Sequence, residues 1–157
     1  MPETFTGTCA FRLMPQDDLA EGPSTATIEQ VAPTQWLVRY TWTHPLDGNQ
    51  HGVLLVGGPD EGADTVGASL ADSWHQNPGL MTLAGTVDGR TGVRLSAQYA
   101  GDWGWEVDLD GLGTDAPSMT MRNVVPASAL EMLPEDAPPV EAGPYDVMVA
   151  RWRSASA

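Results

Sequence analysis

Residues 93–109 read VRLSAQYAGDWGWEVDL and decide the fold class. Apolar and polar side chains alternate along this stretch on both sides of a turn signal at Gly101-Asp102, as in two strands that each bury one face. A loop of three residues at this turn keeps the apolar residues of both strands on the same face. The residues expected on that face are Val93, Leu95, Ala97, Tyr99, Trp103, Trp105, Val107 and Leu109. The stretch therefore predicts an antiparallel hairpin with one apolar, aromatic side.

The same pattern continues through the rest of the chain. Turn signals rich in Gly and Asp separate short runs that are rich in Val, Leu, Thr, Trp and Tyr. A short helical turn is expected at 128–133, where Ser128 and Glu131 have the spacing of a capping box and Pro134 follows. The runs expected to be strands are 4–14, 25–31, 35–43, 51–57, 65–75, 80–87, 91–99, 103–109, 117–125 and 145–153.

Short sequential hairpins with one apolar face favour closure of the sheet, because closure removes its exposed edges. We therefore predict an all-β protein that forms a single up-and-down antiparallel barrel of about ten strands, with at most one short helical turn. A two-sheet sandwich is the alternative, although its Greek-key connections need longer crossings. With 157 residues, the chain is expected to form one domain over residues 1–157.

The charge balance excludes several classes of partner. Twenty-one acidic residues face seven arginines and no lysine, which gives a formal net charge of −14. A surface this negative repels phosphate backbones and anionic headgroups, so we expect no nucleic-acid partner and no membrane partner. No apolar run is long enough for a membrane span, and the first residues lack the pattern of a signal peptide. These features predict a cytoplasmic location.

Several motifs of the chain occur together in a known family. They are Tyr40 through Asp47-Gly48, Asp72-Ser73-Trp74, Pro78-Gly79-Leu80-Met81, Trp103-Gly104-Trp105, Met119-Thr120-Met121-Arg122-Asn123 and the closing run from Tyr145 to Arg153. In these motifs the chain resembles an uncharacterised bacterial family of calycin-like barrels, catalogued as a domain of unknown function. The resemblance implies a calycin-like barrel, akin to lipocalins, fatty-acid-binding proteins and the haem-binding nitrobindins. It carries no established activity, so it bears on the fold and not on the function.

Polar residues on the expected inner face are the candidate site. Alternation within 65–75 places Asp72 inside the barrel, and alternation within 117–125 places Asn123 inside. In the last strand both faces are nearly equally apolar, and one of them carries Arg151. Because an unpaired buried carboxylate is costly, we expect Asp72 to face Arg151, with Asn123 completing the network.

These polar groups are expected to lie in an aromatic cup of Trp36, Tyr40, Trp42, Trp74 and Trp105. Such a set predicts a non-catalytic barrel that binds a small apolar or aromatic molecule in its interior. The alternative is that the rings simply fill the barrel, with Asp72 and Arg151 as a structural pair. The protein would then be a ligand-free interaction module, for example a homodimer formed through a barrel face.

The histidines offer a weaker candidate. A two-residue loop at Asp47-Gly48 would place His44 directly opposite His51, and two imidazoles could share a metal ion. His75 follows Trp74 and is expected on the outer face by alternation, unless Pro78 bends the strand first. The related haem proteins use a histidine on a late strand, and no histidine follows His75. A haem or metal protein is therefore the least favoured reading, and we assign no metal ligand and no cofactor.

Motifs of enzyme chemistry give little support to catalysis. The chain lacks a Gly-x-Ser-x-Gly elbow, a Gly-rich phosphate loop between a strand and a helix, and a His-Glu-x-x-His motif. No pair of carboxylates stands out from the many on the surface. We therefore assign no catalytic residue and favour a non-enzymatic protein, with activity left open.

Overall fold

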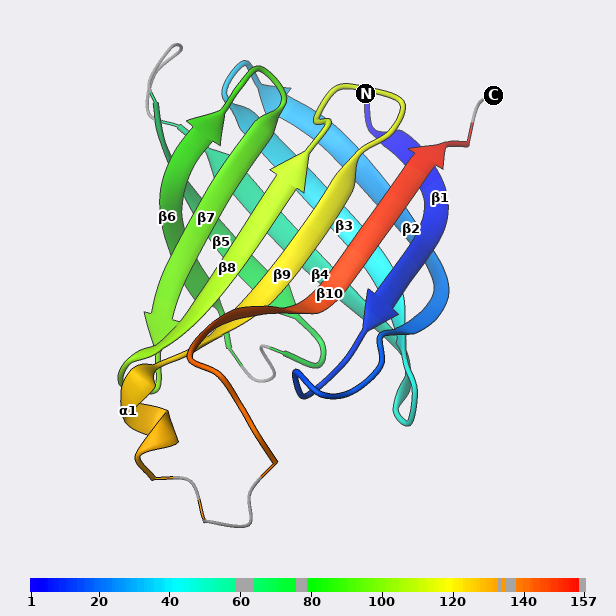
Figure 1. The fold of residues 1–157 in the computed structure, drawn as a ribbon. Coiled ribbons are helices and arrows are strands. Elements are labelled where there is room, and N and C mark those ends of the chain that lie inside the picture. Colours follow the sequence, from blue (N-terminus) through cyan, green and yellow to red (C-terminus); the bar gives the residue numbers. More distant parts are fainter. Residues whose placement is uncertain (59–63, 76–78, 133, 135–137, 156–157) are drawn as a thin grey trace.

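The computed structural model describes residues 1–58, 64–75, 79–132, 134 and 138–155. Within them the chain forms a closed barrel of ten antiparallel strands (Figure 1). The elements are β1 (Glu3–Phe11), β2 (Ala20–Ala32), β3 (Gln35–His44), β4 (Gly48–Gly57), β5 (Thr65–Asp72), β6 (Met81–Asp88), β7 (Gly92–Tyr99), β8 (Trp103–Asp110), β9 (Ser118–Val125), α1 (Ala127–Leu130) and β10 (Gly143–Ser154). The prediction of an up-and-down barrel is confirmed, and the sandwich alternative is wrong.

The barrel closes because its first and last strands pair with each other. β1 runs antiparallel to β10, from Phe5 opposite Ser154 to Phe11 opposite Met148. Every other strand pairs with its neighbours in the sequence, so neither edge of the sheet is left without a ladder. The hairpin between β7 and β8 has the predicted register, with Tyr99 opposite Trp103 at the three-residue loop.

Alternation along the strands places a continuous apolar set inside the barrel. Burial of each large apolar side chain stabilises the fold by about 2 kcal/mol relative to exposure. The largest fully buried side chains are Trp42, Trp152, Phe5, Leu54, Leu70, Leu83, Leu109, Met119, Met121, Met148, Val38 and Val56. The middle of the barrel is therefore packed with side chains, and a ligand site must be sought toward an end.

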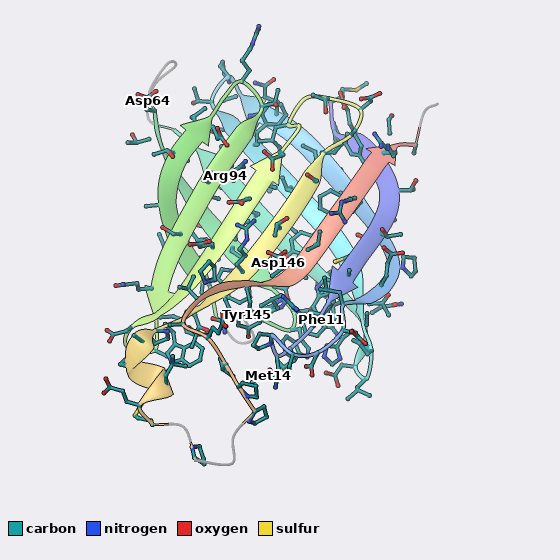
Figure 2. All side chains as sticks on the ribbon, viewed as in Figure 1. Phe11, Met14, Asp64, Arg94, Tyr145 and Asp146 are labelled. Atoms are coloured by element: carbon teal, nitrogen blue, oxygen red, sulfur yellow. The ribbon has the colours of Figure 1, made fainter. Side chains whose placement is uncertain are left out.

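The two ends of the barrel differ. At the end that we call the α1 end, β1, β3, β5, β7 and β9 finish, and α1 lies beside it at the bottom of Figure 1. Figure 2 shows Phe11, Met14 and Tyr145 at this end and Asp64 at the opposite one. The N-terminus and the end of β10 also lie at the opposite end (Figure 1).

The register predicted at the Asp47-Gly48 turn is wrong. His44 pairs with Gly48, so the loop contains the three residues 45–47, and Tyr40 lies opposite Gly52. Gly48 has a φ of +73°, and it occupies the left-handed position that follows a three-residue loop of this kind. His51 consequently lies opposite Thr41 and is exposed, so the predicted pairing of His44 with His51 does not occur.

Several element boundaries also differ from the prediction, among them the end of β1 at Phe11 and the start of β2 at Ala20. β5 ends at Asp72, three residues before the expected end of that strand at 75. The helix begins at Ala127 after Pro126, and the N-cap makes no side-chain hydrogen bond, so the capping box at Ser128 is not formed. The end of the expected helical turn at residue 133 lies outside the described residues. No helix in the described ranges is long and apolar enough to cross a bilayer.

Candidate functional site

A buried carboxylate lies at the end of β5. Asp72 is 3% exposed, which confirms its predicted place inside the barrel. Its Oδ2 accepts hydrogen bonds from the Tyr40 hydroxyl at 2.7 Å and from Trp42 Nε1 at 3.2 Å, both donors being on the neighbouring strand β3. Burial, and next the charge of Asp72, raises the pKa of Tyr40 well above its ordinary value. The phenol therefore keeps the proton that it donates.

The other oxygen of Asp72 holds the turn that follows β5. Oδ1 accepts from the backbone N–H groups of Trp74 and His75, both at 2.9 Å. An aspartate that bonds backbone groups two and three residues ahead turns the chain, so the strand stops here. His75 Nδ1 lies 3.1 Å from the same oxygen. The turn brings His75 inward, and its expected position on the outer face is wrong.

These contacts fix the orientation of the His75 ring. An ionised carboxylate can only accept, so in the neutral imidazole Nδ1 carries the hydrogen and Nε2 carries the lone pair. His75 Nε2 is buried and has no hydrogen-bond partner. Its side chain is 4% exposed. The arrangement leaves a buried acceptor on the ring edge that faces away from Asp72.

Aromatic rings surround His75 on several sides. The His75 ring stacks on Trp42, with centroids 5.2 Å apart and an interplanar angle of 28°. Trp105 is at 5.2 Å and Trp74 at 5.1 Å, the latter edge-on. Phe11 of β1 completes this side at 5.7 Å. The predicted grouping of Trp42, Trp74 and Trp105 thus occurs, with His75 at its centre.

His44 supports the outer side of the same cluster. Its ring stacks on Trp74 with centroids 4.8 Å apart. His44 Nδ1 accepts from the backbone N–H groups of Leu46 and Asp47, at 3.2 and 2.9 Å, so this nitrogen bears a lone pair. The nearby Asp47 carboxylate, at 3.1 Å, is therefore not its partner in an ion pair. Instead, Asp47 Oδ2 accepts from Trp74 Nε1 at 2.8 Å.

A pocket of about 280 Å³ opens beside these rings at the α1 end. It is lined by Leu13, Trp74, His75, Met81, Tyr99, Trp105, Asn123, Tyr145 and Val147. Leu13 is 52% exposed, so the pocket reaches solvent at its rim. A larger hollow of about 530 Å³ lies on the outer side of β1 to β4, where threonines form much of its wall. That hollow has no buried unpartnered group, and the smaller pocket is the better candidate.

Asn123 belongs to the pocket wall and not to the Asp72 network. The Tyr99 hydroxyl donates to Asn123 Oδ1 at 2.6 Å, and Asn123 Nδ2 donates to the Tyr145 hydroxyl at 3.2 Å. Tyr145 in turn donates to the Leu13 carbonyl at 2.9 Å. This chain of bonds joins β7, β9 and β10 to the loop after β1. Asn123 therefore faces inward as predicted, but its partners are tyrosines.

Two predicted site residues lie elsewhere. Arg151 is exposed and lies opposite Thr8 on the outer side of the β1–β10 pair, so the predicted pairing with Asp72 is wrong. The alternative face of β10, with Met148, Ala150 and Trp152 inside, is the one that is buried. Trp36 is near the start of β3, and a side chain added at Gly113 would touch it. Trp36 thus lies toward the opposite end of the barrel and is not part of the cup.

Several residues that line the pocket were not predicted from the sequence. The sequence analysis predicts Tyr99 on the apolar face of its strand and Tyr145 in the last strand, and it assigns none of Leu13, Met81, Tyr99 and Tyr145 to a binding site. The signal for His75 was available, because an aspartate three residues before a histidine at a strand end can hold both the turn and the ring. The tyrosines carried no such signal, since their neighbours come from distant strands.

Because of Asp72, the free energy of unfolding should depend on pH in the acidic range. Burial is the largest effect and raises the pKa of Asp72. The hydrogen bonds of His75, the charge that its ring carries when it is protonated, and the Tyr40 hydroxyl together outweigh burial and lower the pKa to about 2 from an ordinary 3.8. Because the pKa of Asp72 is lower in the folded protein than in the unfolded chain, the ionised carboxylate stabilises the fold at pH values above the unfolded-state pKa. This contribution is lost as the pH falls toward 2. The loss is expected to be about 2 kcal/mol.

The measurement is urea unfolding of the wild type and Asp72→Asn at intervals between pH 5 and pH 2. The difference between the two free energies of unfolding should shrink as the pH falls, because the asparagine variant lacks this titration. A difference that stays constant over that range would show that Asp72 is not a stabilised carboxylate.

No protein-family model matches the chain, and no curated protein matches its sequence. Its function is therefore inferred from the geometry of the site. The pocket offers aromatic faces, one buried acceptor oriented by a carboxylate, and a wall of hydrogen-bonded tyrosines. Among the described residues, no group of three or more His, Cys, Asp or Glu could hold a metal ion. This set suits recognition of a small ring.

Proposed function

We propose that this protein binds a small, uncharged aromatic or apolar molecule in the pocket at the α1 end of its barrel. The observation that carries the proposal is the pocket of about 280 Å³ between Trp74, Trp105 and Tyr99. A cavity of about 150 Å³ holds benzene in a protein interior, so this volume suits one or two fused rings. The ligand would lie at the end of the barrel, because the middle is packed.

The absence of a cation at the pocket favours a neutral ligand. None of the described lining residues is an arginine. The Arg12 guanidinium lies over the ring of Tyr145, 5.7 Å from its centroid, and donates to the Asp146 and Pro15 carbonyls. Arg122 is paired with Asp108 and Asp146 on the outer surface. A carboxylate ligand of the fatty-acid type would therefore have no counter-charge in the described pocket.

Two further parts of the proposal concern relatives and location. A ten-stranded up-and-down barrel with a pocket at one end agrees with the calycin-like resemblance, which we retain. The acidic surface, with a net charge of −14, supports a cytoplasmic protein without nucleic-acid partners. A homodimer that binds nothing is the competing function, and the experiment below separates the two.

One observation favours a metal-centred ligand such as haem as the second candidate. His75 donates Nδ1–H to Asp72 and leaves Nε2 free, which is how metal-binding histidines are commonly oriented. The small volume of the pocket weighs against a porphyrin. Titration with haemin decides the question, since a His75 ligand would give a shifted Soret band that His75→Asn abolishes.

The first test is native mass spectrometry of protein purified from its own host. An extra mass that is lost on denaturation is expected, together with binding of naphthalene to the emptied protein in a calorimetric titration. Leu13→Trp should fill the pocket and weaken naphthalene binding at least about tenfold. The matched control is Leu55→Trp, since Leu55 is 47% exposed on β4 and Leu13 is 52% exposed.

The control variant should bind naphthalene as the wild type does. Equal weakening by both substitutions would place the binding outside the pocket. A ligand-free mass at an integer multiple of the chain, with no naphthalene binding, would support the homodimer instead.

A further inference from the structure

Two buried polar atoms beside the pocket have no hydrogen-bond partner. They are His75 Nε2 and Trp105 Nε1, and no other buried side-chain nitrogen or oxygen in the described residues lacks one. Native proteins pair nearly all such groups, because a buried polar atom that has lost its water is costly. Both residues line the same pocket, and their ring centroids are 5.2 Å apart. Two orphan atoms on one wall point to a missing partner.

The two atoms have opposite hydrogen-bonding roles. Trp105 Nε1 can only donate. His75 Nε2 is an acceptor in the neutral ring, because Nδ1 carries the hydrogen that Asp72 accepts. The rings are tilted by 54°, and the two nitrogens form no hydrogen bond with each other. A single ligand edge with a donor beside an acceptor would satisfy both.

The remaining polar groups of the pocket already have hydrogen-bond partners. The hydroxyl of Tyr99 is committed to Asn123, and the hydroxyl of Tyr145 is committed to the Leu13 carbonyl. Asn123 uses both ends of its amide on these tyrosines. Recognition by direct hydrogen bonds therefore falls to His75 and Trp105.

We infer that the ligand is a flat, uncharged heterocycle that carries an N–H next to a C=O, as in a lactam. Its N–H donates to His75 Nε2, and its carbonyl accepts from Trp105 Nε1. The ring itself lies against the aromatic wall, where stacked and edge contacts are favourable. Asp72 acts as a positioning residue, because it fixes which nitrogen of His75 bears the lone pair. This inference rests on the proposed function and specifies its ligand class.

The test uses three bicyclic probes of similar size in calorimetric titrations. Quinolin-2-one has the N–H and the C=O, N-methylquinolin-2-one keeps only the C=O, and naphthalene has neither. Quinolin-2-one is expected to bind about tenfold or more tightly than naphthalene, with the N-methyl compound between them. Each hydrogen bond to an otherwise unpaired buried group supplies part of this preference.

Two variants and one control test whether the preference for quinolin-2-one depends on Trp105 Nε1 and His75 Nε2. Trp105→Phe keeps an aromatic face and removes the donor. His75→Asn keeps a donor toward Asp72 and removes the ring acceptor at the position of Nε2. Each should weaken quinolin-2-one binding about tenfold more than it weakens naphthalene binding, so the preference for quinolin-2-one over naphthalene falls about tenfold. Trp36→Phe, toward the opposite end of the barrel, is the control and should change neither affinity.

The outcomes separate this inference from the proposed function. If naphthalene and quinolin-2-one bind the wild type equally, the pocket binds aromatic rings but the hydrogen-bonding inference is overturned. The same conclusion follows if Trp105→Phe and His75→Asn preserve the preference. If none of the three probes binds, both the inference and the proposed function fail.

Discussion

Asp72→Ala is expected to lower the free energy of unfolding by about 4 kcal/mol, the largest effect of any single substitution considered for this protein. The carboxylate accepts from Tyr40 and Trp42 on β3 and from two backbone N–H groups of the turn after β5. Alanine leaves these buried donors without an acceptor. It also removes the group that holds His75 Nδ1.

Equilibrium unfolding in urea measures this loss, with near-UV circular dichroism as a report on the packing of the tryptophans. Asp72→Asn should lower the free energy of unfolding by less than Asp72→Ala does. The amide oxygen of asparagine still accepts hydrogen bonds on one side, whereas its NH₂ group faces other donors on the other side and cannot accept from them. The control is Asp64→Asn, since Asp64 is exposed at the opposite end of the barrel (Figure 2). An Asp72→Ala variant within about 1 kcal/mol of the wild type would mean that the network contributes little.

Gly52→Ala is expected to cost about 3 kcal/mol, although it adds a single methyl group. Gly52 of β4 lies opposite Tyr40 of β3, and a Cβ at residue 52 would collide with the Tyr40 ring. The ring must move, and the hydrogen bond from its hydroxyl to Asp72 is then weakened or lost. The cost thus combines overpacking with damage to the buried carboxylate site.

Gly67→Ala on β5 provides the matched control for this substitution. A Cβ at Gly67 would have only the Leu83 carbonyl oxygen near it, at 4.0 Å. Its free energy of unfolding should stay within about 0.5 kcal/mol of the wild type or rise, because alanine restricts the unfolded chain. Equal losses in the two variants would attribute the effect to glycine removal in a strand and not to Tyr40.

Much of the fold could be predicted from the sequence because its signal is local. The alternation through residues 93–109 gave the correct hairpin, with Trp105 opposite Ala97. The turn at Asp47-Gly48 was harder to predict, since a glycine with positive φ is typical both at the end of a two-residue loop and directly after a three-residue loop. The three-residue loop moves the partner of His44 from the expected His51 to Gly48.

The candidate site could be predicted only in part because two irregularities change which side chains point inward. β10 has a register shift between Asp146 and Met148, so Val147 and Met148 are both buried and the alternation reverses. Arg151 therefore points outward, against the prediction. A bulge is set by pairing with neighbouring strands, and nothing in the composition of β10 marks it.

Asp72 was placed correctly because it shares a face with Leu70 within an unbroken strand. Beyond it, the turn that Asp72 itself holds brings His75 inside. The sequence expectation extended the strand to residue 75 and so placed this histidine on the outer face. The inward position of His75 was therefore not predicted, because the strand ends at Asp72 and not at residue 75.

The pairing of β1 with β10 has a practical consequence for handling the protein. The Ala155 N–H donates to the Thr4 carbonyl, so the two ends of the chain leave the barrel next to each other. They do so at the end opposite the pocket (Figure 1). Either terminus can therefore carry a tag, a fluorophore or a surface tether with the pocket mouth unobstructed, and a short linker between them would allow circular permutation.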